Sequence, residues 1–223
     1  SKRGIMMRNN IGLVKHCERA LNEGWGYVWG TFGNVLTQKA FNDKLVQYPE
    51  QLGRHKNYIQ AKLIGKNTVD CIGLIKSYMW LQGDKVVYDP LTDFNTELAL
   101  LRATKKGNIS TLKEVPGTVL YKTGHVGVYI GGGEAIEARG TEYGVVLTKI
   151  DGRGWTDWFE FPGLEYVEDS FVDTYRHWGR DIIEEASSRG WVTGYPDGTF
   201  RPDAPLTRAE GVALVLAAIE KRQ

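Results

Sequence analysis

The sequence predicts an α+β fold in two parts, and three observations support this prediction. Apolar residues recur at helical spacing through the first half of the chain, up to about residue 107. From Pro116 the pattern changes to short strands separated by glycine-rich turns, which is typical of an antiparallel sheet or partial barrel. A polar break at 167–170 then precedes two amphipathic helices. We therefore expect helices packed on a sheet at 1–166 and a small two-helix module at 167–223.

The composition excludes several classes of function. The chain has 223 residues, and a hydrophobic content of 42% is enough for a sizeable core. A net charge of +1 gives no support for nucleic-acid binding, and no apolar run approaches the length of a membrane span. Two cysteines and four scattered histidines form no metal-binding pattern, so we expect no metal and no other cofactor.

Local signals define the expected elements. Helices are expected at 10–24 (capped by Asn10, with Cys17 on its buried face), 37–48, 70–83, 96–106, 178–190 and from Thr207 to about Lys221. Thr207 and Glu210 form a capping box at the start of the last helix. Strands are expected at 118–121, 125–130, 134–138, 145–149 and 155–161. Residues 50–68 are polar and weakly periodic, and the sequence leaves their structure undecided.

A glycine-rich aromatic stretch, 24–33, fits neither a helix nor a regular strand. Its four glycines suggest backbone that passes close to another group, with large rings forming a wall. Tyr27 carries a hydroxyl that could reach into a site, and Trp29 belongs to the same wall. The alternative is an aromatic cluster of the core.

Cys71 lies at the expected start of the helix 70–83. The positive end of a helix dipole lowers the pKa of a thiol and favours the thiolate, which is a nucleophile. The alternative is that Cys71 is a small buried hydrophobic residue, as free cysteines often are.

His125 is the histidine best placed to act as a base for this thiol. On the strand 125–130, Val126 and the residues two and four further on should face the core, and His125 shares the other face with Gly127. The missing side chain of Gly127 would leave space beside the imidazole. The alternative is a strand histidine on a solvated face.

A histidine base needs an acceptor that orients its second nitrogen, and Glu137 on the next strand is the candidate. Glu134 and Arg139 are alternatives, and Glu137 could instead form a surface ion pair with Arg139. His125 and Glu137 share a face only if the hairpin register is even, with Gly127 opposite Glu137. We predict a three-residue loop at 131–133, because an unbulged two-residue turn would place Glu137 on the wrong face.

Three motifs together resemble the NlpC-type cysteine peptidases, which are papain-like hydrolases of bacterial cell walls. They are Tyr27-Val-Trp-Gly, Asp70-Cys71-x-Gly-Leu and Gly-His125-Val-Gly-x-Tyr followed by a glycine-rich turn. The resemblance covers about residues 9–166 and extends to phage and prophage endolysins. It implies that Cys71 is the nucleophile, His125 the base, and Tyr27 the hydroxyl beside the nucleophile.

The resemblance also implies a reaction: hydrolysis of peptidoglycan stem peptides, commonly at the γ-D-glutamyl–diamino acid bond. Asp70 matches an acidic position that contacts a substrate amine, although it could equally serve as a helix cap. An N-acetylmuramoyl-L-alanine amidase with the same residues is one alternative, and an inactive wall-binding protein is another. Two departures stand out. The third residue is usually histidine or an amide rather than a glutamate, which should favour a Cys71–His125 ion pair. The segment 30–69 is also longer than in compact members and leaves the bond specificity open.

The C-terminal residues resemble one S-layer homology repeat. The match rests on Phe-x-Asp173, Trp178, the G-Y-x-D-G-x-F turn at 194–200 and Thr-Arg208-Ala-Glu. It implies binding to a secondary cell-wall polymer through Arg208, Trp178 and Asp173, although Arg208 could simply face solvent. Such repeats often act in threes, so a single copy predicts a homotrimer.

The resemblances together imply a location at the bacterial cell wall or outside the cell. No signal peptide is visible, so the protein would reach the wall by phage-type release or through a signal absent from this sequence.

Overall fold

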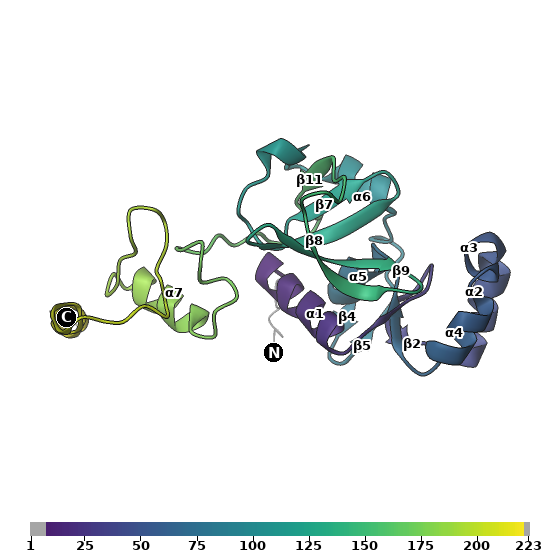
Figure 1. Cartoon of the computed structure of the whole chain (residues 1–223), viewed down its shortest axis with the longest axis horizontal. Coiled ribbons are helices and arrows are strands. Elements are labelled where there is room, and N and C mark those ends of the chain that lie inside the picture. Colours follow the sequence, from purple (N-terminus) through teal and green to yellow (C-terminus); the bar gives the residue numbers. More distant parts are fainter. Residues whose placement is uncertain (1–7, 221–223) are drawn as a thin grey trace. The chain divides into compact units, whose positions relative to one another are not determined.

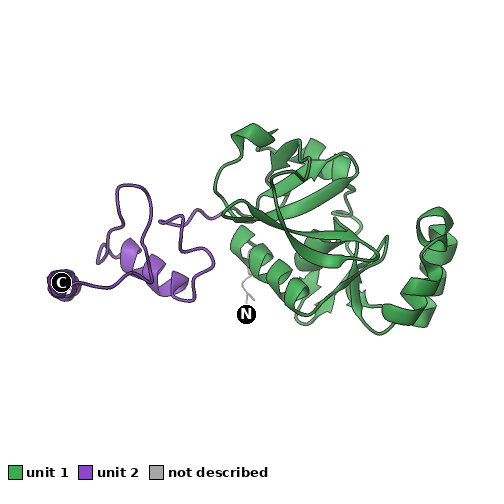
Figure 2. Ribbon diagram, in the orientation of Figure 1, with its two compact units in different colours: residues 1–166 green, residues 167–223 purple. Residues whose placement is uncertain are grey.

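The structure is a computed structural model that describes residues 8–220. It divides into two compact units, 1–166 and 167–223, which Figure 2 distinguishes by colour. The described residues of the first unit combine six α-helices with antiparallel strands, so the α+β prediction is confirmed.

Figure 1 labels most of the helices and many of the strands and colours them in chain order. The helices are α1 Asn10–Asn22, α2 Gln38–Gln47, α3 Pro49–Gly53, α4 Lys56–Lys62, α5 Gly73–Met79, α6 Thr96–Arg102, α7 Arg180–Ser188 and α8 Arg208–Glu220. The strands are β1 Gly26–Tyr27, β2 Phe32–Val35, β3 Asn67–Val69, β4 Leu81–Gln82, β5 Lys85–Val86, β6 Lys106–Asn108, β7 Val119–Lys122, β8 His125–Gly131, β9 Glu134–Gly140, β10 Gly144–Lys149 and β11 Asp157–Phe159. A single 3-10 turn covers Ile109–Thr111.

The main sheet has six strands in the order β10-β9-β8-β7-β11-β6, and all neighbours are antiparallel. Helix α1 packs on β8, β9, β10 and α5 (Figure 1). Val126, Val128 and Ile130 of β8 are buried beneath these helices, as their alternation predicts. The opposite face is covered as well, by a cluster that contains Tyr129 and Trp155.

A second sheet brings the aromatic stretch to the start of α5. Its order is β1-β3-β2, with β1 parallel and β2 antiparallel to β3. Tyr27 is paired with Val69, the last residue of β3. Cys71 follows Val69 by two residues. The sheet therefore fixes the backbone of Tyr27 beside the segment that carries Asp70 and Cys71.

The undecided segment 50–68 contains α3, α4 and β3. Helices α2, α3 and α4 enclose an apolar cluster of their own. Its fully or almost fully buried members are Val28, Leu36, Phe41, Leu52, Ile59 and Leu63. The long insertion thus folds as a helical subdomain with a small separate core.

Four predicted boundaries are wrong. The strand expected at 155–161 spans only Asp157–Phe159, the residues that pair with β6 and β7. The first helix is capped by Asn9, whose side chain accepts from the Gly12 N–H, while the buried Asn10 donates to the Pro116 carbonyl. The cysteine helix spans only Gly73–Met79, because the following residues form the β4–β5 hairpin. The helix predicted at 96–106 ends at Arg102, because 106–108 form the edge strand β6.

The second unit contains α7 and α8, and its buried residues include Phe171, Thr174 and Ile183. The capping box is confirmed, since the Thr207 hydroxyl accepts from the Glu210 N–H and the Glu210 carboxylate accepts from the Thr207 N–H. Helix α8 is described to Glu220, and its predicted end near Lys221 lies outside the described residues. No residue of α8 is buried.

Candidate active site

Cys71 occupies a tight turn between β3 and α5, and its side chain is buried, at 6% exposure. Asp70 makes this turn: its carboxylate accepts from the Gly73 N–H at 2.6 Å and from the Gly30 N–H at 2.8 Å. The first bond caps α5, and the second ties the β1–β2 loop to it. Gly73 is required here, because a Cβ would lie 2.0 Å from the Thr31 carbonyl oxygen.

The expected thiolate is not supported by the environment of Cys71. Burial, followed by the neighbouring Asp70 carboxylate, raises the pKa of the thiol to about 12. The N–H groups of Val126, Ile72 and Cys71 itself act in the opposite direction. The helix dipole has less effect than expected, because α5 begins two residues after Cys71 and has only seven residues. The resting site therefore holds a neutral thiol.

His125 and Glu137 are hydrogen-bonded, with the imidazole Nε2 and the carboxylate Oε2 2.6 Å apart. The pairs Val128–Ile136 and Tyr129–Ala135 continue to Gly127 opposite Glu137, so the predicted register is confirmed. The predicted three-residue loop is wrong. The turn has two residues, Gly132 and Gly133, both at positive φ, and a bulge between Tyr129 and Gly131 restores the even register.

Glu137 is completely buried and accepts further hydrogen bonds from two residues that the sequence did not reveal. Arg153 donates from Nε at 2.8 Å and from Nη2 at 2.6 Å, and the Thr148 hydroxyl donates at 2.8 Å. Burial alone would raise the pKa of Glu137, but the bonds from His125, Arg153 and Thr148 outweigh it and lower the pKa to about 2. Glu137 is therefore a fixed carboxylate and not a surface partner of Arg139.

Trp155 covers one face of the His125 imidazole. Its ring is stacked on His125, with centroids 5.6 Å apart and an interplanar angle of 11°. A Cβ on Gly127 would lie 3.0 Å from the Trp155 ring. The space that Gly127 was expected to leave for a substrate is thus filled by Trp155. The face of β8 that carries His125 is covered by packed side chains and is not solvated.

Tyr27 contributes a half-buried hydroxyl near the thiol. Burial raises its pKa well above the usual range, and the proximity of Cys71 and Asp70 raises it further. Its hydroxyl therefore stays protonated at any physiological pH and can act as a hydrogen-bond donor.

A pocket of about 530 Å³ opens beside Asp70. Its walls combine aromatic rings with charges of both signs, contributed by Trp29, Lys44, Tyr48, Asp70, Lys76 and Asp93. Lys76 is ion-paired with Asp93, whereas the Lys44 Nζ donates to the Gln47 amide oxygen at 3.1 Å. Lys44 and Tyr48 lie on α2 and at its C-terminal end, so the inserted helices form one wall of this pocket.

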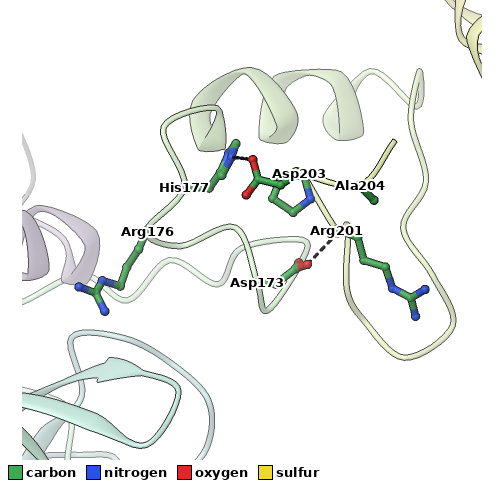
Figure 3. A pocket seen from close by; sticks show the side chains of 7 residues that line it. Asp173, Arg176, His177, Arg201, Asp203 and Ala204 are labelled. Carbon is green, nitrogen blue, oxygen red and sulfur yellow. Dashed lines mark hydrogen bonds and ion pairs between the residues drawn. The ribbon is translucent and has the colours of Figure 1, made fainter. Parts of the chain in front are cut away.

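The three residues expected to bind a wall polymer, all in the second unit, do not line one common pocket. Both carboxylate oxygens of Asp173 are occupied by the N–H groups of Phe200 and Arg201, at 2.8 and 2.7 Å. A pocket of about 500 Å³ beside Asp173 is lined by Arg176, His177 and Arg201 (Figure 3). Neither Trp178, which is 85% exposed, nor the exposed Arg208 lines this pocket.

The described part of the chain offers neither a metal site nor a membrane-spanning helix. Within residues 8–220, no group of three or more His, Cys, Asp or Glu side chains is arranged to hold a metal ion. No helix in the same range has the length and apolar character that crossing a membrane requires.

The fold and the site define a class of protein: an α+β domain in which a buried cysteine lies against the strand that carries a histidine–carboxylate pair. Residues 24–161, more than half of the chain, match the model of the NlpC/P60 family, and the chain belongs to this family. Residues 170–210 match the S-layer homology domain. Both resemblances are thereby confirmed.

Solved structures with a similar arrangement include the NlpC/p60 domain of the peptidoglycan hydrolase SagA. It has 15% identity and a TM-score of 0.41, and the match covers 69% of this chain and 99% of that one. The peptidoglycan hydrolase RipB from Mycobacterium tuberculosis has 19% identity and a TM-score of 0.40, covering 71% of this chain and 68% of that one.

Among curated proteins, two from Acetivibrio thermocellus match short segments. Cell surface glycoprotein 1 is 36% identical over 75 residues, which is 34% of this chain and 3% of that protein. The cellulosome-anchoring protein is 42% identical over 55 residues, which is 25% of this chain and 12% of that protein. The chain thus spans only a small part of the curated relatives that it matches.

Proposed function

We propose that this chain is a peptidoglycan hydrolase of the cysteine peptidase type, with Cys71 as nucleophile, His125 as base and Glu137 as the residue that orients the base. The observation that carries the proposal is the 2.6 Å hydrogen bond between His125 and Glu137. The same strand, β8, contacts the nucleophile, because the backbone N–H of Val126 donates a hydrogen bond to the Cys71 thiol. A thiol next to an imidazole with an oriented second nitrogen is the arrangement that acyl transfer needs.

The neutral resting thiol determines the first step. Cys71 transfers its proton to His125 as the sulfur attacks the amide carbon, and the imidazolium then protonates the leaving amine. Backbone N–H groups in the turn before α5, including that of Cys71, and the protonated Tyr27 hydroxyl stabilise the oxyanion. His125 finally activates the water that hydrolyses the thioester.

The pocket beside Asp70 receives the peptide. Asp70 attracts a substrate amine, and Trp29 provides an apolar wall. Lys44 supplies a positive charge that a carboxylate of the stem peptide would meet. A pocket with both signs of charge suits a γ-D-glutamyl–diamino acid substrate, which carries an amine and a carboxylate close together.

The second unit directs the enzyme to the wall, where it binds a secondary cell-wall polymer. Trp178 and Arg208 are exposed and available for this contact, and Asp173 acts by holding the turn that carries Arg201. The exposed apolar side chains of α8, Val212, Val215, Leu216 and Ile219, support assembly into a homotrimer. Light scattering that shows a monomer at micromolar concentration would contradict the trimer.

A digest of purified cell wall tests the proposal. Wild type should leave an L-Ala-D-Glu stub on the glycan, detected by mass spectrometry. Release of the intact stem peptide would instead indicate an N-acetylmuramoyl-L-alanine amidase. Cys71→Ala should abolish digestion and still bind wall, and digestion by this variant would overturn the mechanism. Absence of any digestion by wild type would leave an inactive wall-binding protein.

A further inference from the structure

Arg153 is the least expected residue of the site. It lies in the loop between β10 and β11, is only 23% exposed, and grips both carboxylate oxygens of Glu137. The same Oε2 atom is 2.6 Å from Arg153 Nη2 and 2.6 Å from His125 Nε2. The two nitrogens therefore lie no more than about 5.2 Å apart, twice that distance.

In this geometry the Glu137 carboxylate is hydrogen-bonded both to His125 and to the positively charged Arg153. A carboxylate alone would stabilise a protonated imidazole, whereas a guanidinium at this distance opposes it. We propose that Arg153 is a positioning residue that balances the negative charge of the Glu137 carboxylate. His125 then donates its hydrogen bond to a rigid ion pair that has no net charge. The Glu137–Arg153 pair then replaces a neutral hydrogen-bonding side chain, and it keeps the Cys71–His125 couple uncharged until a substrate arrives.

Lys122 of β7 holds the backbone of Arg153 in place. The Arg153 carbonyl oxygen accepts from the Lys122 Nζ at 2.9 Å, and that Nζ lies 5.0 Å from the centroid of the Trp155 ring. Trp155, two residues after Arg153, is the ring stacked on His125. One short loop thus supplies the ion that neutralises Glu137 and the ring that confines the imidazole.

Other titratable or charged groups lie on the elements near His125 and stay constant between the variants. The titratable or charged groups on neighbouring elements are Lys122 on β7, Arg139 on β9, Glu97 on α6, Asp70 and Cys71 before α5, and Tyr27 on β1. The experiment below changes only the pair, so differences between variants report on Glu137 and Arg153.

The test follows the titration of the His125 ring protons by NMR, with His125→Asn used to assign the signal. Arg153→Gln leaves the carboxylate unbalanced, and the midpoint should move to higher pH by about one to two pH units. Glu137→Gln should move it to lower pH. The double variant with glutamine at both positions removes both charges, and its midpoint should return to within about half a pH unit of wild type.

A second measurement uses the thiol. Iodoacetamide should alkylate Cys71 of the Arg153→Gln variant about tenfold faster than wild type at pH 6, because the small fraction of thiolate paired with protonated His125 rises by about that factor. Cys17 is completely buried, so its labelling, measured by mass spectrometry, reports unfolding. Arg153→Lys keeps the charge and should leave the midpoint unchanged. If this variant shifts the midpoint as much as Arg153→Gln does, or if Arg153→Gln shifts nothing, the proposal is wrong.

The inference rests on the proposed cysteine mechanism for its meaning in catalysis, but neither measurement requires a substrate. If the His125 midpoints of the variants move as expected but wild type digests no cell wall, the proposed hydrolase function is wrong and the proposed role of Arg153 stands. If wild type digests the wall but the His125 midpoint of Arg153→Gln equals that of wild type, the role of Arg153 is wrong and the hydrolase function stands.

Discussion

Replacing Glu137 with glutamine should destabilise the first unit in a pH-dependent way. The pKa of Glu137 is about 2 in the folded protein, whereas a solvated glutamate of the unfolded chain has its ordinary pKa of 4.5. Because the folded value is lower, the carboxylate contributes stability above pH 4.5 and loses it as the pH falls through 2. The difference of about 2.5 pH units corresponds to about 3 kcal/mol at neutral pH.

The glutamine variant also leaves Arg153 without its carboxylate, so the total loss at pH 7 should be about 3–5 kcal/mol. The assay is urea unfolding of wild type and variant at pH 7, 5 and 3, followed by tryptophan fluorescence. The gap between the two proteins should be largest at pH 7 and 5 and clearly smaller at pH 3. Glu142→Gln changes an exposed carboxylate in the β9–β10 turn and should cost less than about 0.5 kcal/mol. A gap for Glu137→Gln that stays constant across these pH values would refute the reasoning.

Three further variants probe packing, acid stability and substrate binding. Gly127→Ala should push Trp155 away from the imidazole and cost about 1–3 kcal/mol in urea unfolding, with reduced wall digestion. His16 is buried and its pKa is lowered to about 4, mainly by burial, so it stabilises the fold above pH 6.5 and loses this contribution as the pH falls through 4. Wild type should therefore lose up to about 3 kcal/mol more than His16→Gln between pH 7 and 4. Lys44→Met should raise KM for stem peptides about tenfold and leave kcat unchanged.

Each of these variants has a matched comparison. Gly53 has open space around it, so Gly53→Ala should not destabilise, and an equal loss in both glycine variants would contradict the packing argument. If wild type and His16→Gln lose stability in parallel on acidification, another group is responsible. Lys39 is exposed on the same helix as Lys44, and an equal effect of Lys39→Met on KM would show that only the net charge matters.

The sequence was sufficient for the elements whose side chains alternate or recur regularly. The strands of the sheet follow from the period of two, and parity states which registers pair His125 with Glu137. The even register itself comes from the bulge in β8 and not from the predicted three-residue loop. Thr148 could have been found by extending the register by one strand, since Val146 lies opposite Glu137 and Thr148 is its next neighbour on the same face. Arg153 and Trp155 could not, because they lie in a turn whose path no periodicity records.

The protonation state of the Cys71 thiol also could not be predicted from the sequence. The prediction of a thiolate assumed that Cys71 begins a helix, but Asp70 caps α5, which starts two residues after the cysteine. The protonation of Cys71 depends on its burial and on the distance to that carboxylate. Neither quantity can be obtained from the spacing of residues along the chain.

The bulge in β8 links the evolution of a surface turn to the chemistry of a buried carboxylate. Deleting or inserting one residue among the glycines at 131–133 would exchange the two faces of β9 and turn Glu137 away from His125. A change of two residues, or a single change offset by removal of the bulge, would preserve the pair. Length variation in this hairpin should therefore occur among active relatives only in combinations that keep the register even.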